Sequence, residues 1–552
     1  MHIWDTHEIH NQVDELQDYA LLGEDPALHA ALLRNGAQSW LPQLQAYGRQ
    51  LGQGITWKLA DQANAHGPVL QRFDARGRLC EDLIFHPAWH ALMALYRQQG
   101  LVSMPFDSAL PGRWSAWAAG FYMHSQVEQG TMCPATMTTA AIPLLRKEPA
   151  LWAQLEAGLF SRRYDERDLP ADRKVSLWIG MGMTEKQGGS DVRANTTRAR
   201  PAGDGGRGGE YLLRGHKWFY SAPTSDAHLV VAQVDPDGGP ACFWVPRWRP
   251  DGTRNAIRIQ RLKDKLGNRS NASSEVEFQD AYGVLMGDAG RGIPTIIEMA
   301  TMTRLNCVLG SSAILRTATV QALAYARKRK AFGKVLVAHP LMRSVLVDLA
   351  LESEAALTLS MRLAQAFELE EQPLHRAWKR ILTPAAKFWV CKRTVALTAE
   401  AMEVMGGNGY VETSVMARLL REAPVNSIWE GSGNIMCLDV LRAVEREPEA
   451  ASLLLQDLAQ QAGEDAALKR TLQHLLQALH LPAAQQEAQA RQWVQQLVLL
   501  AQACLLRSHA PQAVAEAFVQ SRLGLEAAGW VAGAIDIHNM DVDAILQRAL
   551  PV

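Results

Sequence analysis

The feature that most constrains the fold is a change in the pattern of apolar residues in the middle of the chain. From Lys174 to about Asp280 the sequence is made of short runs rich in β-branched and aromatic residues, at 176–179, 229–231, 242–245, 257–259 and 276–278. On both sides of this block the apolar residues recur at helical spacing instead. The sequence therefore predicts a mainly α-helical protein with one central β domain, in which the glycine-rich stretch 203–209 forms a hairpin loop.

The helical segments after the β block are long. Three amphipathic helices are expected at 304–329, 341–369 and 384–405, and the glycine-rich cluster at 406–409 ends the third of them. A chain of 552 residues is too long for one compact core. Four domains are expected: an N-terminal helical domain at 1–173, the β domain at 174–285, a helical bundle at 286–445 and an extra C-terminal helical domain at 446–552.

Composition argues against several classes of function. The formal net charge is -1, so no global charge points to a nucleic acid or a membrane surface. The seven cysteines lack a C-x-x-C pair, which argues against a zinc site or a disulfide framework and fits a reducing compartment. The start of the chain lacks a signal-peptide layout, and the best membrane candidate, 493–506, is broken by Gln496 and Gln502. We expect a cytoplasmic protein with no metal.

Two stretches of the β block carry groups suited to a flat ligand. Residues 183–191 read Met-Thr-Glu-Lys-Gln-Gly-Gly-Ser-Asp, where glycines allow close backbone approach and Thr184 and Ser190 supply hydroxyl groups. A polar turn between strands explains the same residues equally well.

The second stretch reads Trp-Phe-Tyr-Ser at 218–221. Strict alternation along a strand places Phe219 and Ser221 on one face, where a ring and a hydroxyl could meet a cofactor, and Trp218 and Tyr220 on the other. Taken alone, an aromatic run of this kind is more often core than cofactor site.

Two further stretches lie in the helical part. Residues 327–334 place basic side chains at the end of a helix, where they either complement the helix dipole or grip a pyrophosphate. Residues 426–434 place Glu430 in a turn between apolar segments, and a lone glutamate before glycine is usually a helix cap or a surface charge. Each of the four stretches is a weak signal by itself.

Together and in this order, the stretches resemble the acyl-CoA dehydrogenase family. That family's T-E-P-x-x-G-S-D loop is matched at 184–191, with Lys186 in place of the proline. The strings 183–191, 262–272 and 426–438 are similar to its AidB-like branch, bacterial proteins of the adaptive response to alkylation, and the similarity covers essentially the whole chain. The other matched motifs are K-x-aromatic-I-T/S at Lys217, Phe219 and Ser221, R-x-x-F-G at Arg329, Phe332 and Gly333, G-G-x-G-Y at 406–410, and Y-E-G-T/S at 429–432.

The resemblance implies that FAD binds between the β domain and the bundle. Arg329 and Phe332 match residues that reach the cofactor of a neighbouring subunit, so a homotetramer is implied. The residues that the resemblance assigns to cofactor binding are Met183, Thr184, Gly189, Ser190, Phe219, Tyr220, Ser221, Arg329, Phe332, Ile428, Trp429, Gly431, Ser432 and Asn434.

The resemblance also implies α,β-dehydrogenation, with Glu430 as the catalytic base that removes the proton beside a thioester carbonyl. AidB-like members are associated with weak activity on isovaleryl-CoA, with double-stranded DNA binding and with protection against alkylation damage. Trp429 is bulkier than the usual tyrosine, which disfavours efficient turnover of long-chain substrates.

DNA binding rests on the resemblance and not on composition. Residues 450–552 contain six basic and nine acidic residues, whereas duplex binding draws most of its affinity from neutralised phosphates. The candidate contacts are Arg470, Arg507 and Arg522. Three hypotheses remain: a DNA-protecting flavoprotein with weak dehydrogenase activity, a genuine short- or branched-chain acyl-CoA dehydrogenase without a DNA role, and a flavin-stabilised assembly protein.

Overall fold

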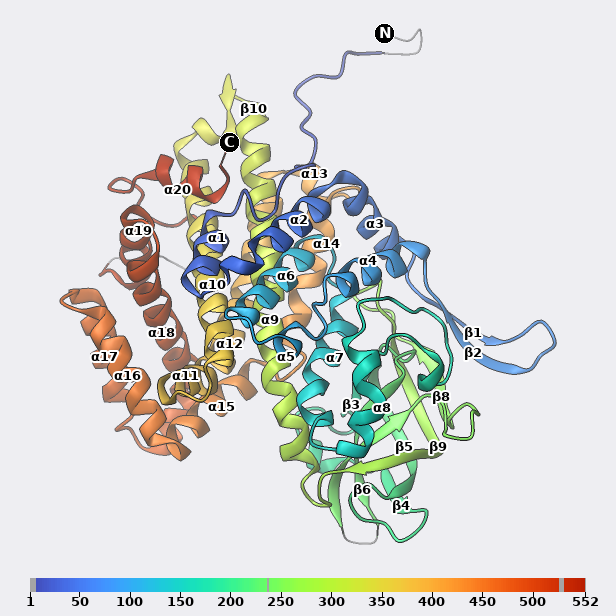
Figure 1. Cartoon of the computed structure of the whole chain (residues 1–552). Helices are drawn as coiled ribbons and strands as arrows, with labels where there is room; N and C mark the ends of the chain where they lie inside the picture. The colour runs from blue at the N-terminus through green and yellow to red at the C-terminus, as the bar shows by residue number, and fades with distance from the viewer. Residues whose placement is uncertain (1–5, 236–237, 526–530, 552) are drawn as a thin grey trace.

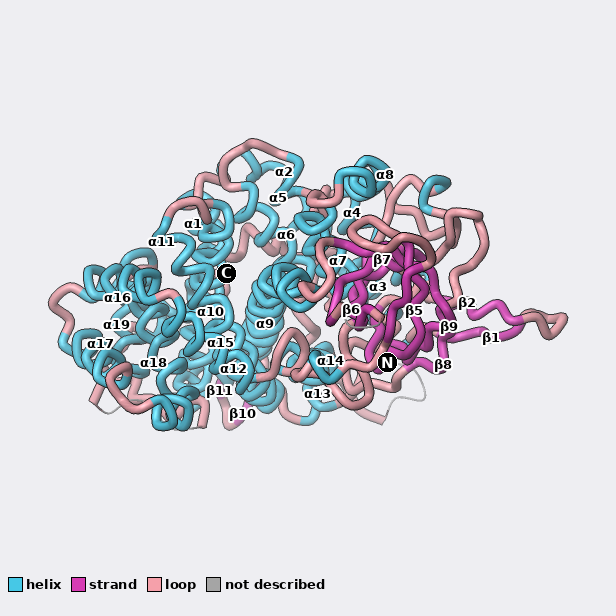
Figure 2. The backbone as a smooth tube through the Cα atoms, turned by 90° about the horizontal axis from the view of Figure 1, so that it is seen from below, coloured by secondary structure: helices cyan, strands magenta, loops and turns pink. Residues whose placement is uncertain are grey.

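The protein is a helical molecule with a β barrel at one end. The computed structural model describes residues 6–235, 238–525 and 531–551. In Figure 1 the barrel strands lie at the lower right and the C-terminal helices at the left, with the long helices of the bundle between them. Seen from below, the strands again gather on one side and the helices fill the rest (Figure 2). The predicted fold class, mainly α with a central β domain, is confirmed.

Helices form most of the N-terminal region, as predicted. Asp25 begins the first helix, because its side chain accepts a hydrogen bond from the Leu28 N–H at 3.0 Å. The described helices of this region are α1 (Pro26–Arg34), α2 (Leu41–Gly52), α3 (Gly54–Ala65), α4 (Pro87–Gln98), α5 (Met104–Asp107), α6 (Arg113–Val127), α7 (Met132–Leu145) and α8 (Pro149–Phe160).

One element of this region was not predicted. Strands β1 (Val69–Phe73) and β2 (Leu79–Ile84) form an antiparallel hairpin that projects from the molecule at the right of Figure 1. Asp74 shapes its turn by accepting hydrogen bonds from the N–H groups of Arg76 and Arg78 at 2.8 and 2.9 Å. Gly77 adopts a φ of 75° there. The hairpin is short and lies between helices, so the helical spacing of the apolar residues around it gave no indication of strands.

The central strands close into a barrel. Their order is β3-β6-β4-β5-β9-β7, with β8 on β9, and an additional pairing between β6 and β7 closes the sheet on itself. The predicted hairpin loop at 203–209 connects the antiparallel β4 and β5. Of the run 176–179, only Ile179 is in a strand. The strands are β3 (Ile179–Gly182), β4 (Arg198–Pro201), β5 (Glu210–Ser221), β6 (Ala227–Val234), β7 (Gly239–Pro246), β8 (Ile257–Leu262) and β9 (Ser273–Met286).

The bundle that follows is built around α9 (Gly292–Lys328), which packs against α6, α7, α10 and α12. Among the described helices, α9 alone is long and apolar enough to cross a membrane, and its most apolar 18 residues, with a mean hydropathy of 1.3, are all buried inside the protein. The prediction that 493–506 is the best membrane candidate was therefore wrong. The remaining elements are β10 (Lys330–Ala331), β11 (Lys334–Val335), α10 (Pro340–Glu368), α11 (Pro373–Ala377), a π-helical turn (Trp378–Leu382), α12 (Thr383–Val404), α13 (Gly407–Tyr410), α14 (Val415–Glu422) and α15 (Gly433–Arg446).

The C-terminal helices pack tightly on the bundle. Helix α18 (Ala483–His509) lies against α10, α12 and α15, and its apolar face at Trp493, Leu497, Leu500 and Cys504 is buried. Arg548 fixes the last helix by donating from Nε to both Glu354 oxygens at 2.9 Å. The other helices of this region are α16 (Pro448–Ala462), α17 (Ala466–Ala478), α19 (Gln512–Leu523) and α20 (Val542–Ala549).

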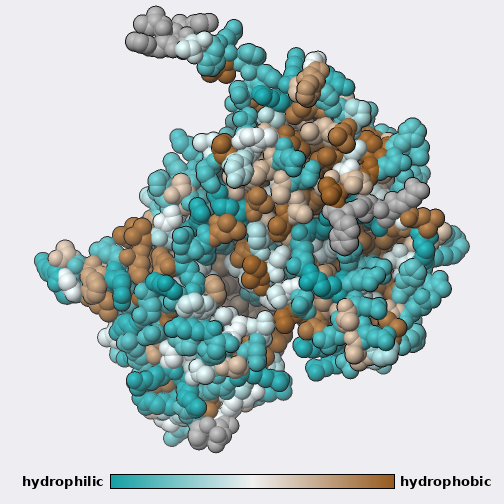
Figure 3. Space-filling view, turned by 180° about the vertical axis from the view of Figure 1, so that it is seen from behind, coloured by the Kyte–Doolittle hydropathy of each residue, from teal (hydrophilic) through white to brown (hydrophobic). Residues whose placement is uncertain are grey.

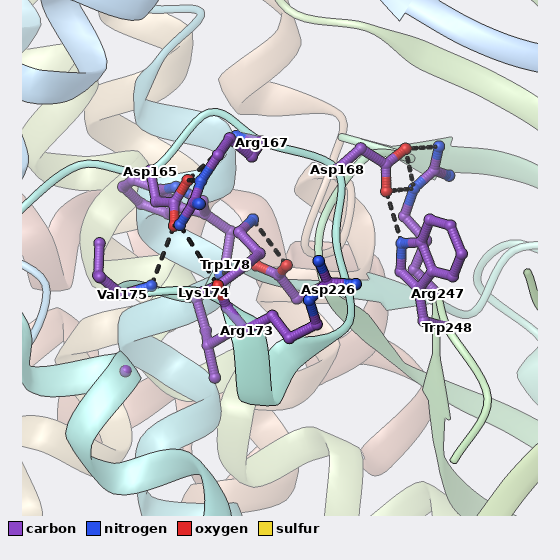
Figure 4. Close-up of polar contacts among 12 residues, drawn as sticks. Asp165, Arg167, Asp168, Arg173, Lys174, Val175, Trp178, Asp226, Arg247 and Trp248 are labelled. Atoms are coloured by element: carbon purple, nitrogen blue, oxygen red, sulfur yellow. Dashed lines mark hydrogen bonds and ion pairs between the residues drawn. The ribbon is translucent and has the colours of Figure 1, made fainter. Parts of the chain in front are cut away.

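Ion pairs attach the segment before the barrel to the barrel itself (Figure 4). Asp168 accepts from Arg247 Nη2 at 2.6 Å and from Trp248 Nε1 at 2.7 Å. Lys174 pairs with the buried Asp226 at 2.7 Å, and Asp226 also accepts from the Trp178 N–H at 2.7 Å. A buried carboxylate that is paired and hydrogen-bonded holds its neighbours in one arrangement. The position of the barrel relative to the N-terminal helices is thereby fixed.

Candidate active site

Glu430 lies in a turn between the 3₁₀ turn Ala423–Ser427 and α15. Its backbone has a φ of 58°, in the left-handed region, and the following Gly431 has a φ of 105°. The Thr303 hydroxyl of α9 donates to Glu430 Oε2 at 2.5 Å. Arg304 Nε donates to the Glu430 carbonyl oxygen at 3.1 Å. A strained backbone held by two neighbours of the same helix gives the carboxyl one defined position.

Burial raises the pKa of the Glu430 carboxyl above its ordinary value. The Thr303 hydrogen bond and the positive charges of Lys387 and Arg304 oppose this rise. Desolvation disfavours the charged form of an acid, so a carboxyl in this setting binds a proton more strongly than one in water. A half-buried glutamate of raised pKa has the properties required of a general base.

The aromatic strand does not follow simple alternation. The register of β5 against β9 shifts between Lys217 and Tyr220. Both of these side chains are therefore buried, while Trp218 and Phe219 lie outside the barrel together, with the Lys263 ammonium 3.5 and 4.6 Å from their ring centroids. The predicted placement of Trp218 and Phe219 on opposite faces was wrong, because an irregularity of this kind inserts residues into the strand.

Tyr220 is a core residue of the barrel. Its side chain is 1% exposed, and its ring stacks on His228 with centroids 3.8 Å apart. The prediction that its side chain lines the flavin site is therefore wrong. Phe219 is 49% exposed and Ser221 is half-buried, so these two residues remain available to a ligand.

The loop at 183–191 is held from inside by a buried ion pair. Glu185 and Lys217 are both fully buried, and their charged atoms are 2.7 Å apart. Burial acts to raise the pKa of Glu185, but the Lys217 ammonium and hydrogen bonds from Thr196 and Thr197 lower it to about 2. Burial lowers the pKa of Lys217 to about 8 despite this partner. The glutamate of the loop is therefore a structural anchor.

The other predicted residues of this loop face outward. Gly189 and Ser190 are exposed, and Met183 and Thr184 are half-buried. The Trp218 N–H donates to the Thr184 carbonyl oxygen at 2.8 Å, which ties the loop to the aromatic strand. The loop and strand thus present hydroxyl groups, glycine backbone and an exposed ring side by side.

Cys133 marks the place where the barrel meets the bundle. It is buried in α7, and the groups that influence the pKa of its thiol include Ser221 and Lys265 from the barrel side and Glu430 from the bundle. Burial raises the pKa of this thiol to about 12, so it is neutral. Ser221 of the barrel and Glu430 of the bundle therefore both lie in the neighbourhood of this thiol. Sequence motifs did not point to Cys133, since an isolated cysteine in a helix has no motif.

The segment 262–272 completes this junction. Lys265 Nζ donates to the Asn271 carbonyl oxygen at 2.7 Å. The Asn271 side chain is 1% exposed, and its amide finds no hydrogen-bond partner among the described residues. A buried amide of this kind is costly unless a ligand satisfies it. The amide offers N–H donors and a carbonyl acceptor, which suit the edge of a flavin ring.

The residues on both sides of Glu430 include one that contacts a C-terminal helix. Ile428 is 66% exposed, and Trp429 Nε1 donates to Asn426 Oδ1 at 3.0 Å. Arg491 of α18 donates from Nη1 to Asn434 Oδ1 at 2.9 Å. The predicted residues Gly431, Ser432 and Asn434 thus join the turn of Glu430 to α15, and Arg491 is a neighbour that the motifs did not reveal.

Arg329 and Phe332 lie apart from the other predicted site residues. They belong to the hairpin of β10 and β11, at the end of the molecule opposite to strands β4 and β6 (Figure 1). Arg329 donates to the Asn11 carbonyl oxygen, and Phe332 is 97% exposed with a φ of 49°. Within one chain these residues do not join the site around Glu430. Seen from behind in Figure 3, the apolar residues shown in brown occur mostly in the upper half of the molecule.

The three arginines predicted to contact DNA are engaged within the protein. Arg522 donates from Nε to Glu352 at 2.8 Å and also pairs with Asp348, and its side chain is only 6% exposed. Its prediction as a DNA contact is therefore wrong. Arg470 donates to the Leu523 carbonyl oxygen at 2.9 Å. Arg507 pairs with Asp465.

Comparison with known proteins agrees with this arrangement. The family model for the AidB N-terminal domain matches residues 11–166, the acyl-CoA dehydrogenase middle domain matches 180–281, and the acyl-CoA dehydrogenase C-terminal domain matches 290–445. The chain belongs to the acyl-CoA dehydrogenase family. It is an FAD-dependent oxidoreductase of the acyl-CoA dehydrogenase type.

Similar proteins span nearly the whole chain. The putative acyl-CoA dehydrogenase AidB of Escherichia coli is 48% identical over 522 residues, which cover 94% of this chain and 95% of that protein. Acyl-CoA dehydrogenase family member 11 of Caenorhabditis elegans is 30% identical and covers 76% of this chain and 70% of its own. The solved structure of C. elegans ACDH-11 with C11-CoA has a TM-score of 0.83 at 24% identity, covers 100% of this chain and 94% of its own, and supports the fold.

The residues present fit the flavin that the family requires. Asn271 offers an unsatisfied buried amide, and Ser221, Thr184 and Ser190 offer hydroxyl groups on the surface of the same barrel. We expect these groups to hold the ring and its chain, with Phe219 against the ring face.

Proposed function

We propose that this protein oxidises a short branched-chain acyl-CoA of the isovaleryl-CoA class to its α,β-unsaturated product, with Glu430 as the base. The observation that carries the proposal is the Glu430 carboxyl, which the Thr303 hydroxyl holds in a turn of the bundle, with Ser221 of the barrel in the same neighbourhood around Cys133. A base and a cofactor site must lie on the two sides of one substrate for proton and hydride to leave adjacent carbons.

The residues around Glu430 have defined parts in this reaction. Glu430 takes the proton from the carbon beside the thioester carbonyl, and Thr303 and Arg304 hold its carboxyl and carbonyl groups in place. Bound FAD supplies the acceptor for the hydride that leaves the next carbon. Trp429, fixed by its bond to Asn426, occupies space beside the base, which favours a short acyl chain and slow turnover.

The direct test is an anaerobic titration with isovaleryl-CoA, followed by loss of the flavin absorbance band. Wild-type protein should bleach. Glu430→Gln should keep FAD and bind acyl-CoA but show no bleaching, because the amide cannot accept the proton. The exposed Glu449→Gln of α16 is the matched control and should bleach as wild type does. Equal bleaching by Glu430→Gln would remove Glu430 from the mechanism.

Duplex DNA binding in the alkylation response is the second candidate, and its support is the likeness to AidB. Salt-dependent titration of duplex DNA against the full chain separates it from dehydrogenation, since phosphate contacts give a steep loss of affinity with salt. Binding that does not change with salt, or no binding at low salt, would exclude it.

We also propose that the protein is a homotetramer in the cytoplasm. A homotetramer is supported by the exposed Phe332 at the tip of a hairpin that lies far from the chain's own barrel. All seven cysteines are free thiols, which supports a cytoplasmic location.

A further inference from the structure

Lys387 is a buried charge next to Glu430. It lies in α12 and is 1% exposed. Its Nζ donates to the Asn426 carbonyl oxygen at 3.0 Å and to the Gly431 carbonyl oxygen at 2.7 Å. These two carbonyl groups lie on either side of Glu430 in the sequence. One ammonium therefore holds both ends of the turn that carries the base.

The charge of Lys387 has no partner in direct contact. Within the described parts of the chain, no carboxylate forms a hydrogen bond or ion pair with its ammonium. Two other buried cations have such a partner: Lys217 contacts Glu185, and Arg522 contacts Glu352. Burying an ammonium without a counter-charge in contact is costly.

The Glu430 carboxyl is the acid that this charge acts on. Lys387 and Arg304 are the two positive charges whose field favours its ionised form. Arg304 is already paired with Asp439 at 2.6 Å, which offsets its charge. Burial raises the pKa of the facing thiols, so they carry no charge. The titratable and charged groups facing Glu430 are Arg304 and Cys307 from α9, Lys387 from α12 and Cys133 from α7.

We propose that Lys387 is a positioning residue for Glu430, which fixes the turn through two carbonyl groups and supplies the uncompensated positive charge that lets the carboxylate exist in a closed site. This inference rests on the proposed function of Glu430 as the base. Without the charge, the same burial would keep the acid protonated and unable to accept a proton from substrate. Without the two hydrogen bonds, the left-handed turn would relax.

Three substitutions separate charge from geometry. Lys387→Gln keeps a hydrogen-bond donor and removes the charge, Lys387→Arg keeps both, and Lys387→Met removes both. The control is Lys379→Met. Lys379 lies in the π-helical turn just before α12, and the substitution removes an ammonium group that pairs with Glu370. Glu430→Gln identifies the infrared carboxyl band of Glu430 by difference. Each FAD-loaded protein is titrated with pH while that band is followed, and the rate of flavin reduction by isovaleryl-CoA is measured over the same pH range.

We expect ionisation of Glu430 to move to higher pH in Lys387→Gln and to return toward wild type in Lys387→Arg. On the acid side of the profile, flavin reduction by Lys387→Gln should be about tenfold slower than by Lys387→Arg. Lys379→Met should match wild type in both measurements. Should Lys387→Met fail to fold, the Gln and Arg pair still decides the question.

Two failures are distinguishable. If Glu430→Gln reduces flavin like wild type, the proposed function fails, and the infrared titration still tests the influence of Lys387 on Glu430. If the Glu430 band titrates at the same pH in wild type and Lys387→Gln, the inference on Lys387 is overturned, whatever the activity.

Discussion

The buried Glu422 carboxyl is expected to make the stability of this protein depend on pH. It ends α14, is 2% exposed, and accepts a hydrogen bond from the Asn268 N–H at 2.7 Å. Burial, followed by the nearby Glu128 carboxylate, raises its pKa to about 7. The Asn268 bond and the charges of Arg418 and Lys265 act in the opposite direction without cancelling this rise.

The sign of the effect follows from the raised pKa. The folded protein binds the Glu422 proton more tightly than the unfolded chain, whose value is 4.5. The contribution to stability is therefore fully present below pH 4.5 and is lost as pH rises through about 7. The difference between these two values corresponds to about 3 kcal/mol. Glu422→Gln keeps the acceptor oxygen and removes the titration, so it should stabilise the protein at pH 8 by up to about 3 kcal/mol.

The assay is the midpoint of thermal unfolding for wild type and Glu422→Gln from pH 4.5 to 8.5, at one protein and one FAD concentration. Subtracting the two curves removes all groups that titrate alike in both proteins. The gap should be near zero at pH 4.5 and open between pH 5 and 7.5, with the variant more stable. The exposed Glu449→Gln should follow wild type throughout. Parallel curves for wild type and Glu422→Gln would refute the reasoning.

Three further predictions concern buried or exposed side chains. Lys217→Met leaves the Glu185 carboxylate buried without its partner, so it should lower the free energy of unfolding by about 3–5 kcal/mol, which denaturant titration would detect. Arg522→Gln should lower the unfolding midpoint but leave the salt dependence of any duplex binding unchanged, because Arg522 is internal; a reduced salt slope would contradict this. Phe332→Asp should leave the fold intact by circular dichroism and weaken the tetramer by about 2 kcal/mol per subunit, seen as smaller species in sedimentation, whereas an unchanged tetramer would exclude this side chain from the interface.

The sequence predicted the order of the elements well because periodicity reports burial. Helix α10 was expected at 341–369 and lies at Pro340–Glu368, and α12 was expected at 384–405 and lies at Thr383–Val404. The helix expected at 304–329 in fact begins at Gly292. Its first turns carry apolar residues on several sides, so they lack the one-sided pattern that predicted the rest of the helix. Helix spacing could predict these elements since each buries a face along its whole length.

The details of the site were beyond the sequence for physical reasons. Tyr220 was assigned to the flavin surface, but one register shift turns it into the barrel, and nothing in the local sequence specifies such a shift. Arg522 was assigned to DNA, although a cation on a helix gives no sign of the two carboxylates that a distant helix brings to it. Lys387 was missed for the same reason, because its partners are backbone carbonyls 39 and 44 residues further along the chain.

The two glutamates of the matched motifs show how environment assigns opposite parts to the same side chain. Burial pushes the pKa of both upward. Glu185 contacts an ammonium at 2.7 Å and accepts from two backbone N–H groups, so it is ionised and fixed. Among the described residues, the Glu430 carboxylate accepts a hydrogen bond only from the Thr303 hydroxyl, and the Lys387 charge limits the rise in its pKa without contacting it. Of the two, burial therefore prevails only at Glu430, which leaves that carboxyl able to take and release a proton while Glu185 holds the loop at 183–191 in shape.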